Sequence, residues 1–198
     1  MRKLAILTFV SLDGVMQGVG SPDEDPAGGF RQGGWAMPYW DGVMAQVERE
    51  AMAEPYDMLF GRKTYELFAA SRDAGPNSEN VNSKLDAARK YVLSSTMARS
   101  DWQNTIILSG DLTEEIPRLK AKDGPLIQIH GSSQLIQALL TADLVDEMRL
   151  WIFPVTLGSG KKPFADSPAS HRFDLVKSEP TGNGVVMNIY RKTDAAKS

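Results

Sequence analysis

The chain has 198 residues, of which 42% are hydrophobic and 24% charged, a composition typical of one compact domain with a sizeable core. A formal net charge of −3 argues against nucleic acid as the main partner, because phosphate backbones require a basic surface. The absence of cysteine excludes disulfides and thiolate chemistry, and with only two histidines, His130 and His171, we expect no metal site. The sequence contains no apolar run long enough to predict a membrane span. The short apolar stretch near Met1 is not followed by the small-residue cleavage site of a signal peptide, so we expect a cytoplasmic protein.

The first predicted element is a strand over residues 3–10, whose apolar side chains run without alternation and indicate a strand covered on both faces. Residues 14–34 are rich in glycine, proline and aspartate and predict a long irregular loop, of a kind that is often functional. A helix is predicted over residues 39–53, with apolar residues at the spacing of one face, and Pro55 ends it.

Strands and helices alternate over the middle of the chain. Strands are predicted at 56–60, 90–94, 104–110, 125–131 and 146–155, and helices at 62–70, 112–121 and 132–141. The last unit is a hairpin over residues 173–192 with a Gly-Asn-Gly turn. We therefore predict one α/β domain over residues 1–192, with a mostly parallel central sheet, helices on both faces and an antiparallel hairpin at the edge. Residues 193–198 are predicted to be a frayed tail.

Two cations open the helix that is predicted to follow Gly61. Arg62 and Lys63 occupy the positive end of the helix dipole, where acidic side chains are preferred. Either both side chains point into water at a small cost, or an anionic ligand compensates them. In the second case Gly61 allows close approach of a phosphate, Arg62 adds a forked contact, and Thr64 serves as a cap or as a phosphate donor.

Two further strand ends carry groups that suit a phosphate. Gly131, Ser132 and Ser133 join a buried strand to an amphipathic helix, where bare amides can bind an anion; a serine cap on an ordinary turn is the alternative. Ser94 and Ser95, followed by Thr96, end another strand without an acidic neighbour, which suits a 2′-phosphate; an ordinary loop is the alternative. The Rossmann fingerprint, the P-loop and the G-x-S-x-G elbow are all absent.

Five segments together resemble the dihydrofolate reductase-like superfamily, and most closely the single-domain relatives of the reductase domain of the bifunctional riboflavin-synthesis deaminase/reductase. They are SLDGVMQG (11–18), MLFGRKTYELF (58–68), KYVLSST (90–96), IHGSSQLIQALL (129–140) and FPVTLGSGKKPF (153–164). They occur in the family's order and cover nearly the whole chain. The resemblance implies a dihydrofolate reductase-like three-layer fold, NADPH as the cofactor and a homodimer with its contact near residues 146–155 and 156–164.

The same resemblance assigns cofactor residues. It places Gly61, Arg62, Lys63 and Thr64 at the phosphates, Ser94 and Ser95 near the 2′-phosphate, Gly131, Ser132, Ser133 and Gln134 at the pyrophosphate, and the stretch from Val10 to Gly18 over the nicotinamide. The charge at the helix start is then compensated by the ligand.

On the substrate side the resemblance is weaker. Residues 33–44 are similar to the segment that leads into the substrate helix of dihydrofolate reductase, and Asp41 is the nearest match to its carboxylate; an N-cap is the alternative. Asp13 is matched in the riboflavin-type domains and is by this resemblance a second catalytic candidate beside Asp41, with an ordinary Asp-Gly turn as the alternative. Trp35, Tyr39 and Trp40 either stack on a flat heterocycle or pack the loop against the core.

One departure from the family pattern concerns the substrate. His130-Gly131-Ser132 stands where the riboflavin-pathway reductases carry Glu-Gly-Gly, so the pathway's pyrimidine substrate is not implied for this chain. His130 is either a polar residue of the cleft or a partly buried strand end.

These observations predict an NADPH-dependent reductase that delivers a hydride to a C=N or C=O bond of a small heterocycle, similar to the riboflavin-pathway 5-amino-6-(5-phosphoribosylamino)uracil reductase. The proton would come from Asp41 or from water. A true dihydrofolate reductase and a non-catalytic NADPH-binding sensor module are the alternatives.

Overall fold

The computed structural model describes residues 1–51, 53–71, 84–164 and 170–193. Its strands are β1 (Leu4–Ser11), β2 (Tyr56–Gly61), β3 (Lys90–Leu93), β4 (Thr105–Leu108), β5 (Leu126–Ile129), β6 (Glu147–Phe153), β7 (Phe173–Pro180) and β8 (Val186–Lys192). Its helices are α1 (Trp40–Ala51), α2 (Arg62–Ser71), α4 (Leu112–Ala121) and α5 (Ser133–Thr141), with short 3₁₀ helices η1 (Ala27–Gly29) and η2 (Met37–Tyr39).

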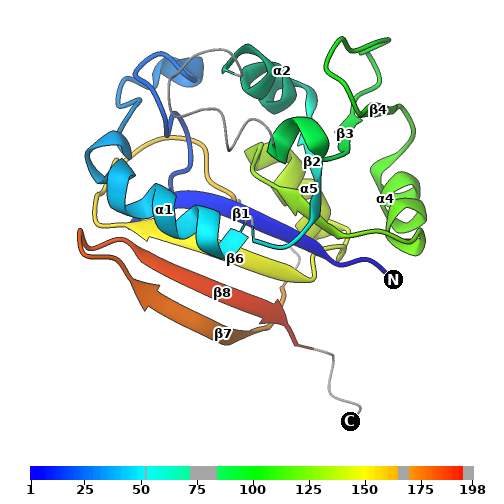
Figure 1. Ribbon diagram of the computed structural model, residues 1–198. Helices are drawn as coiled ribbons and strands as arrows, with labels where there is room; N and C mark the ends of the chain where they lie inside the picture. The colour runs from blue at the N-terminus through cyan, green and yellow to red at the C-terminus, as the bar shows by residue number, and fades with distance from the viewer. Residues whose placement is uncertain (52, 72–83, 165–169, 194–198) are drawn as a thin grey trace.

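The strands form one sheet in the order β4-β3-β2-β5-β1-β6-β8-β7 (Figure 1). β1 lies inside this sheet and pairs in parallel with β5 on one side and with β6 on the other. β2, β3 and β4 extend the parallel part, whereas β8 pairs antiparallel with both β6 and β7. The predicted α/β fold, with a mostly parallel sheet and a C-terminal antiparallel hairpin, is confirmed.

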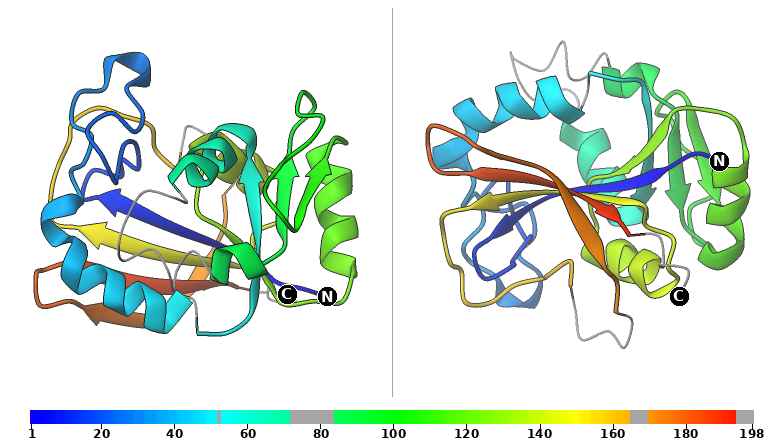
Figure 2. Two further views of the ribbon diagram at one scale, coloured as in Figure 1. Left: turned by 45° about the horizontal axis from the view of Figure 1, so that its top comes forward. Right: turned by 90° about the horizontal axis from the view of Figure 1, so that it is seen from below.

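Helices cover both faces of the sheet, as predicted (Figure 2). α1 and α2 pack on one face, where Val43, Val47 and Tyr65 meet sheet residues in one apolar cluster. α4 and α5 pack on the other face, where the second apolar cluster lies. Leu7 of β1 belongs to the first cluster and Ile6 to the second, which explains why the apolar residues of this strand do not alternate with polar ones.

The ends of several elements differ slightly from their predicted positions. The strand predicted at 104–110 stops at Leu108, because Asp111 accepts a hydrogen bond from the amide of Thr113 and caps α4. The strand predicted at 125–131 stops at Ile129, because Gly131 has a φ of 120° and Ser132 caps α5.

The hairpin closes as the sequence predicts. The Thr181 amide donates to the Val185 carbonyl at 2.7 Å, and the turn between them contains Gly184 at a φ of 86°. Beyond β8, the Thr193 amide donates a hydrogen bond to the backbone carbonyl of Arg172. The rest of the predicted frayed tail lies outside the described residues. In the part of the chain that the structure describes, no helix is both long and apolar enough to cross a membrane.

Candidate active site at the carboxyl edge of the sheet

The segments that were predicted to bind the cofactor all follow the carboxyl ends of parallel strands. In sheet order, β3 leads to Ser94 and Ser95, β2 to Arg62, β5 to Gly131 and β1 to the loop after Ser11. These four strands are neighbours, so the sheet brings together segments that lie far apart in the sequence. Open α/β sheets bind ligands at this edge.

Arg62 is held across the gap between the start of α2 and the end of β3. Its Nε lies 2.7 Å from Oε1 of Glu66, one turn along the helix, and one terminal nitrogen donates to Oγ1 of Thr96 at 2.9 Å. Oγ of Ser94 accepts hydrogen bonds from the amides of Thr96 and Met97. An arginine fork and two hydroxyl groups therefore meet at one place, whereas Ser95 is exposed beside them.

Thr96 was not among the predicted cofactor residues. The sequence feature that could have identified Thr96 is its hydroxyl group, the third in the Ser-Ser-Thr run. Its contact with Arg62, however, depends on the pairing of β2 with β3. The first turn of α2 contains no acidic residue, and the carboxylate that pairs with Arg62 is that of Glu66, one turn further along the helix.

The turn between β5 and α5 lies against the start of α2. A Cβ atom built at Gly61 would come within 3.3 Å of Oγ of Ser132, and one at Gly131 within 3.9 Å of Oγ1 of Thr64. Ser132 is the N-cap of α5, which was the alternative to a phosphate-binding role for this turn. Its carbonyl accepts a hydrogen bond from the amide of Ile136. Ser133 is buried and Gln134 is exposed. The two predicted phosphate-binding turns thus lie against each other, with Gly131 buried and Gly61 and Ser132 half-buried between them.

Asp13 holds two loops together. Its carboxylate accepts from Oγ of Ser11 at 2.6 Å and from the amides of Leu157 and Gly158 at 3.1 and 2.7 Å. These bonds, the one from Ser11 first, lower the pKa of Asp13 to about 2. A carboxyl group with this pKa is ionised at neutral pH, so the geometry favours an anchoring role over the catalytic role that the resemblance implied for Asp13.

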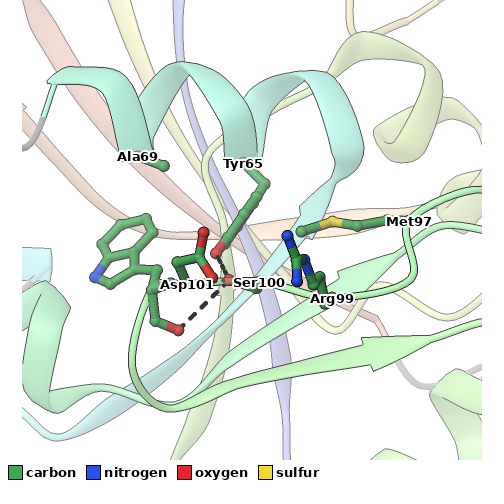
Figure 3. A pocket seen from close by; sticks show the side chains of 7 residues that line it. Tyr65, Ala69, Met97, Arg99, Ser100 and Asp101 are labelled. Carbon is green, nitrogen blue, oxygen red and sulfur yellow. Dashed lines mark hydrogen bonds between the residues drawn. The ribbon is translucent and has the colours of Figure 1, made fainter.

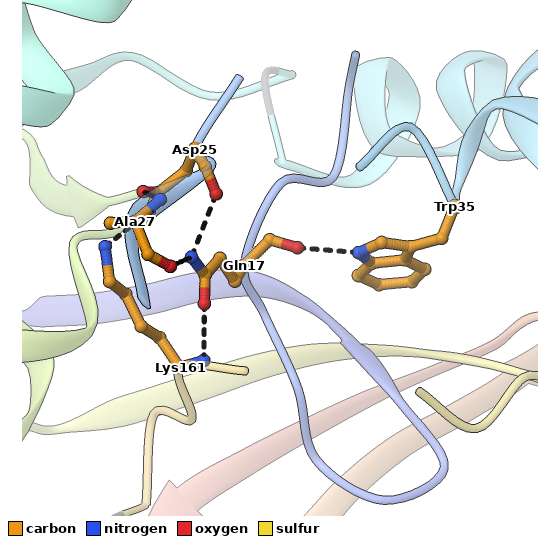
Figure 4. A network of polar contacts seen from close by, with 5 residues as sticks. All are labelled: Gln17, Asp25, Ala27, Trp35 and Lys161. Carbon is orange, nitrogen blue, oxygen red and sulfur yellow. Dashed lines mark hydrogen bonds and ion pairs between the residues drawn. The ribbon is translucent and has the colours of Figure 1, made fainter. Parts of the chain in front are cut away.

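The loop between Gly14 and Gly34 is tied down by the buried side chain of Gln17 (Figure 4). Its Nε2 donates to the carbonyls of Asp25 and Ala27, both at 2.9 Å, and its Oε1 accepts from the amide of Lys161 at 2.9 Å. Nζ of Lys161 forms an ion pair with Asp25, 2.5 Å away. The segment that was predicted to be irregular is therefore fixed to residues 157–162 by specific contacts.

The predicted stacking residues differ in exposure. Trp35 is only 8% exposed and donates from Nε1 to the carbonyl of Gln17 at 2.8 Å, so it packs the loop, as the second interpretation held. Tyr39 and Trp40 are half-buried, and Trp40 packs edge-on against Phe9 of β1 with ring centroids 5.8 Å apart. Val10 is buried within β1.

The backbone of Asp41 lies in the first turn of α1, one residue after the helix begins. Its side chain lies outside the described part of the structure, and its role stays a prediction.

His130 is half-buried at the end of β5, edge-on to Phe68 of α2 with centroids 6.2 Å apart. Burial, together with the guanidinium of Arg149, lowers the pKa of His130 to about 4, so the ring is neutral at neutral pH. Its Nε2 lies 3.0 Å from Oε1 of Gln128, a buried residue that the sequence did not single out. The sequence feature that could have identified Gln128 is that it is a polar residue inside the otherwise apolar run Leu126–Ile129.

A separate pocket of about 340 Å³ lies between α2 and the segment after Thr96 (Figure 3). It is lined by Tyr65, Ala69, Met97, Arg99, Ser100, Asp101 and Trp102. The Tyr65 hydroxyl is hydrogen-bonded to Ser100 on its wall. None of the predicted site residues lines this pocket. Among the described residues, no group of three or more histidines and carboxylates could hold a metal ion.

Comparison with known proteins shows the family and the fold of the chain. Residues 2–187 match the sequence model of the RibD C-terminal domain. The chain belongs to the RibD C-terminal domain family. It is also 34% identical over 136 residues to the protein YyaP of Bacillus subtilis (strain 168), an alignment that covers 67% of this chain and 72% of YyaP.

Three solved structures share the fold of this RibD C-terminal domain. A putative riboflavin biosynthesis protein from Shewanella sp. PV-4 has a TM-score of 0.67 and 24% identity, with 97% of this chain and 99% of that one covered. A pyrimidine reductase-like protein from Corynebacterium diphtheriae has a TM-score of 0.63 and 13% identity, with 98% and 93% covered. Dihydrofolate reductase from Enterococcus faecalis, complexed with NADP(H) and RAB-propyl, has a TM-score of 0.61 and 16% identity, with 97% of each chain covered. The expected dihydrofolate reductase-like fold is thereby confirmed.

Proposed function

We propose that this RibD C-terminal domain protein is an NADPH-dependent reductase that acts on a small heterocycle. The observation that carries the proposal is the meeting of Arg62, Thr96 and Ser94 at the end of β3, beside an α2 first turn without a carboxylate. A guanidinium fork with hydroxyl donors suits the 2′-phosphate that distinguishes NADPH from NADH.

The residues along the edge fit the rest of an extended dinucleotide. Gly61 and Gly131 place no side chain between the turns that carry Thr64 and Ser132, where a Cβ atom would come within 3.3 to 3.9 Å of those residues and would obstruct a pyrophosphate. Lys63, Ser133 and Gln134 belong to the same two turns, and the Val10–Gly18 stretch continues the line at the end of β1. When bound, NADPH supplies the hydride.

The chain itself would orient the reactants and exclude water. The half-buried rings of Phe9, Tyr39 and Trp40 offer an apolar wall for a flat substrate. The ionised Asp13 and the neutral His130 are both unsuited to give up a proton at neutral pH, which leaves Asp41 or water as the proposed donor.

Binding of NADPH and NADH to the Arg62→Ala variant tests the proposal. We expect the affinity for NADPH to fall by about 10- to 100-fold, the loss of a charge-assisted hydrogen bond, and the affinity for NADH to change little. Arg118→Ala is the matched control, because Arg118 also pairs with a glutamate in its own helix, Glu114 at 3.0 Å, but lies in α4. Unchanged NADPH affinity in Arg62→Ala, or no binding at millimolar NADPH, contradicts the proposal.

Turnover separates the reductase from its alternatives. NADPH oxidation with dihydrofolate would favour a dihydrofolate reductase, whereas tight NADPH binding without oxidation by any of a panel of pyrimidines, pteridines and flavin precursors would favour a sensor.

A further inference from the structure

The orientation of the Gln128 side chain is fixed by a backbone carbonyl. Gln128 is 1% exposed, and its Nε2 lies 2.6 Å from the carbonyl oxygen of Ala51, the last residue of α1. A carbonyl oxygen can only accept, so the amide nitrogen of Gln128 must face it. The amide oxygen, Oε1, therefore faces the other way.

This orientation determines the tautomer of His130. Nε2 of His130 lies 3.0 Å from Oε1 of Gln128, and an amide oxygen can only accept a hydrogen bond. The proton of the neutral ring is therefore on Nε2, and Nδ1 carries the lone pair. Protonation of Nδ1 is suppressed near neutral pH, because burial and the positive charge of Arg149 disfavour the imidazolium.

The lone pair of Nδ1 has no partner in the described part of the chain. Nδ1 forms no hydrogen bond with a described residue. A buried nitrogen without a partner would count among the buried unsatisfied atoms, and Nδ1 is not one of them, so this atom is accessible to solvent. His130 also directly precedes Gly131, whose turn lies against Thr64 at the start of α2. The ring itself stands edge-on to Phe68. An acceptor of fixed direction is thus placed next to the proposed cofactor surface.

We propose that Nδ1 of His130 is a specificity contact of the substrate site, which accepts a hydrogen bond from an amino or ring N–H group of the heterocycle. This inference rests on the proposed function. A substrate that presents an oxygen lone pair at this place would meet another lone pair and be rejected, because both groups would lose hydrogen bonds to water without replacing them. His130 then selects the substrate and gives it no proton.

The tautomer can be tested without any ligand. The chain has two histidines, so ¹⁵N-histidine NMR of the wild type and of His130→Phe assigns the ring of His130 by difference. We expect a protonated Nε2 and an unprotonated Nδ1 throughout neutral pH, and Gln128→Leu should make the ring exchange between tautomers. A protonated Nδ1 in the wild type overturns the inference.

Ligand selection is tested with 4-aminopyrimidine and 4-methoxypyrimidine on the NADPH-saturated protein. The first offers N–H donors and the second offers only acceptors on the same ring. We expect the amino compound to shift the Nδ1 signal and to bind about tenfold more tightly than the methoxy compound, the factor for one neutral hydrogen bond. His130→Phe should lose this preference, and His130→Asn, whose side chain can present an oxygen near the position of Nδ1, should retain part of it.

The two proposals fail in different ways. If NADPH binds and the preference for the amino compound is absent, or persists in His130→Phe, the inference about His130 is wrong and the proposed function stands. If NADPH does not bind to the wild type, the proposed function fails first.

Discussion

At the scale of single residues, charge and hydrogen-bond capacity predicted some roles and could not predict others. Arg62 was identified because a cation at a helix start is unfavourable, and the structure does bring it to the end of β3. The tautomer of His130 could not be predicted, because it depends on a contact between Gln128 and Ala51, which are 77 positions apart in the sequence. Local sequence therefore indicates an unusual charge but not the partner that explains it.

Asp13→Asn separates an anchoring role from a catalytic one. The pKa of Asp13 falls from 3.8 to about 2 on folding, so the ionised carboxylate stabilises the fold above about pH 4 and this contribution is lost as the pH falls toward 2. We expect the variant to melt a few degrees lower at pH 7 and to lose that acid-dependent part of the melting profile. Thermal denaturation between pH 2 and 7 measures this. Wild-type stability combined with abolished turnover would show that Asp13 acts in the chemistry instead.

At the scale of elements, the periodicity of apolar residues predicted strands and helices well, because burial in a layered sheet imposes that periodicity. The loop between Gly14 and Gly34 was predicted only as irregular. Its conformation depends on Gln17, whose contact with Lys161 joins positions 144 residues apart. Such a contact leaves no periodic signal in the sequence.

Gln17→Ala should release this loop. The substitution leaves the carbonyls of Asp25 and Ala27 and the amide of Lys161 without their partner, so we expect the free energy of unfolding to fall by about 1–3 kcal/mol. Amide hydrogen exchange should accelerate in residues 14–34 and 157–162. Urea denaturation and exchange mass spectrometry measure the two effects.

Gln137→Ala is the control for Gln17→Ala, because Gln137 also contacts the second of these segments, through the carbonyl of Lys162, but the contact is exposed. We expect little change in its stability or exchange. Equal effects of the two variants would mean that Gln17 does not organise the loop.

At the scale of the whole molecule, the order of the strands is what assembles the site. The alternation of elements predicted a mostly parallel sheet, but the order β3-β2-β5-β1 that joins the four segments came from the structure and not from periodicity. The expected homodimer stays a prediction. β6 pairs with β1 and β8, so a dimer contact near residues 146–155 would use side chains of this strand and not its hydrogen-bonding edges.

The most direct test of the central claim is amide NMR of the protein titrated with NADPH. The account predicts that signals move along one line of the molecule, in residues 10–18, 61–64, 94–96 and 131–134, and that NADH leaves residues 94–96 largely unaffected. Signals that move only on β7 and β8, or that do not move at all, would contradict it.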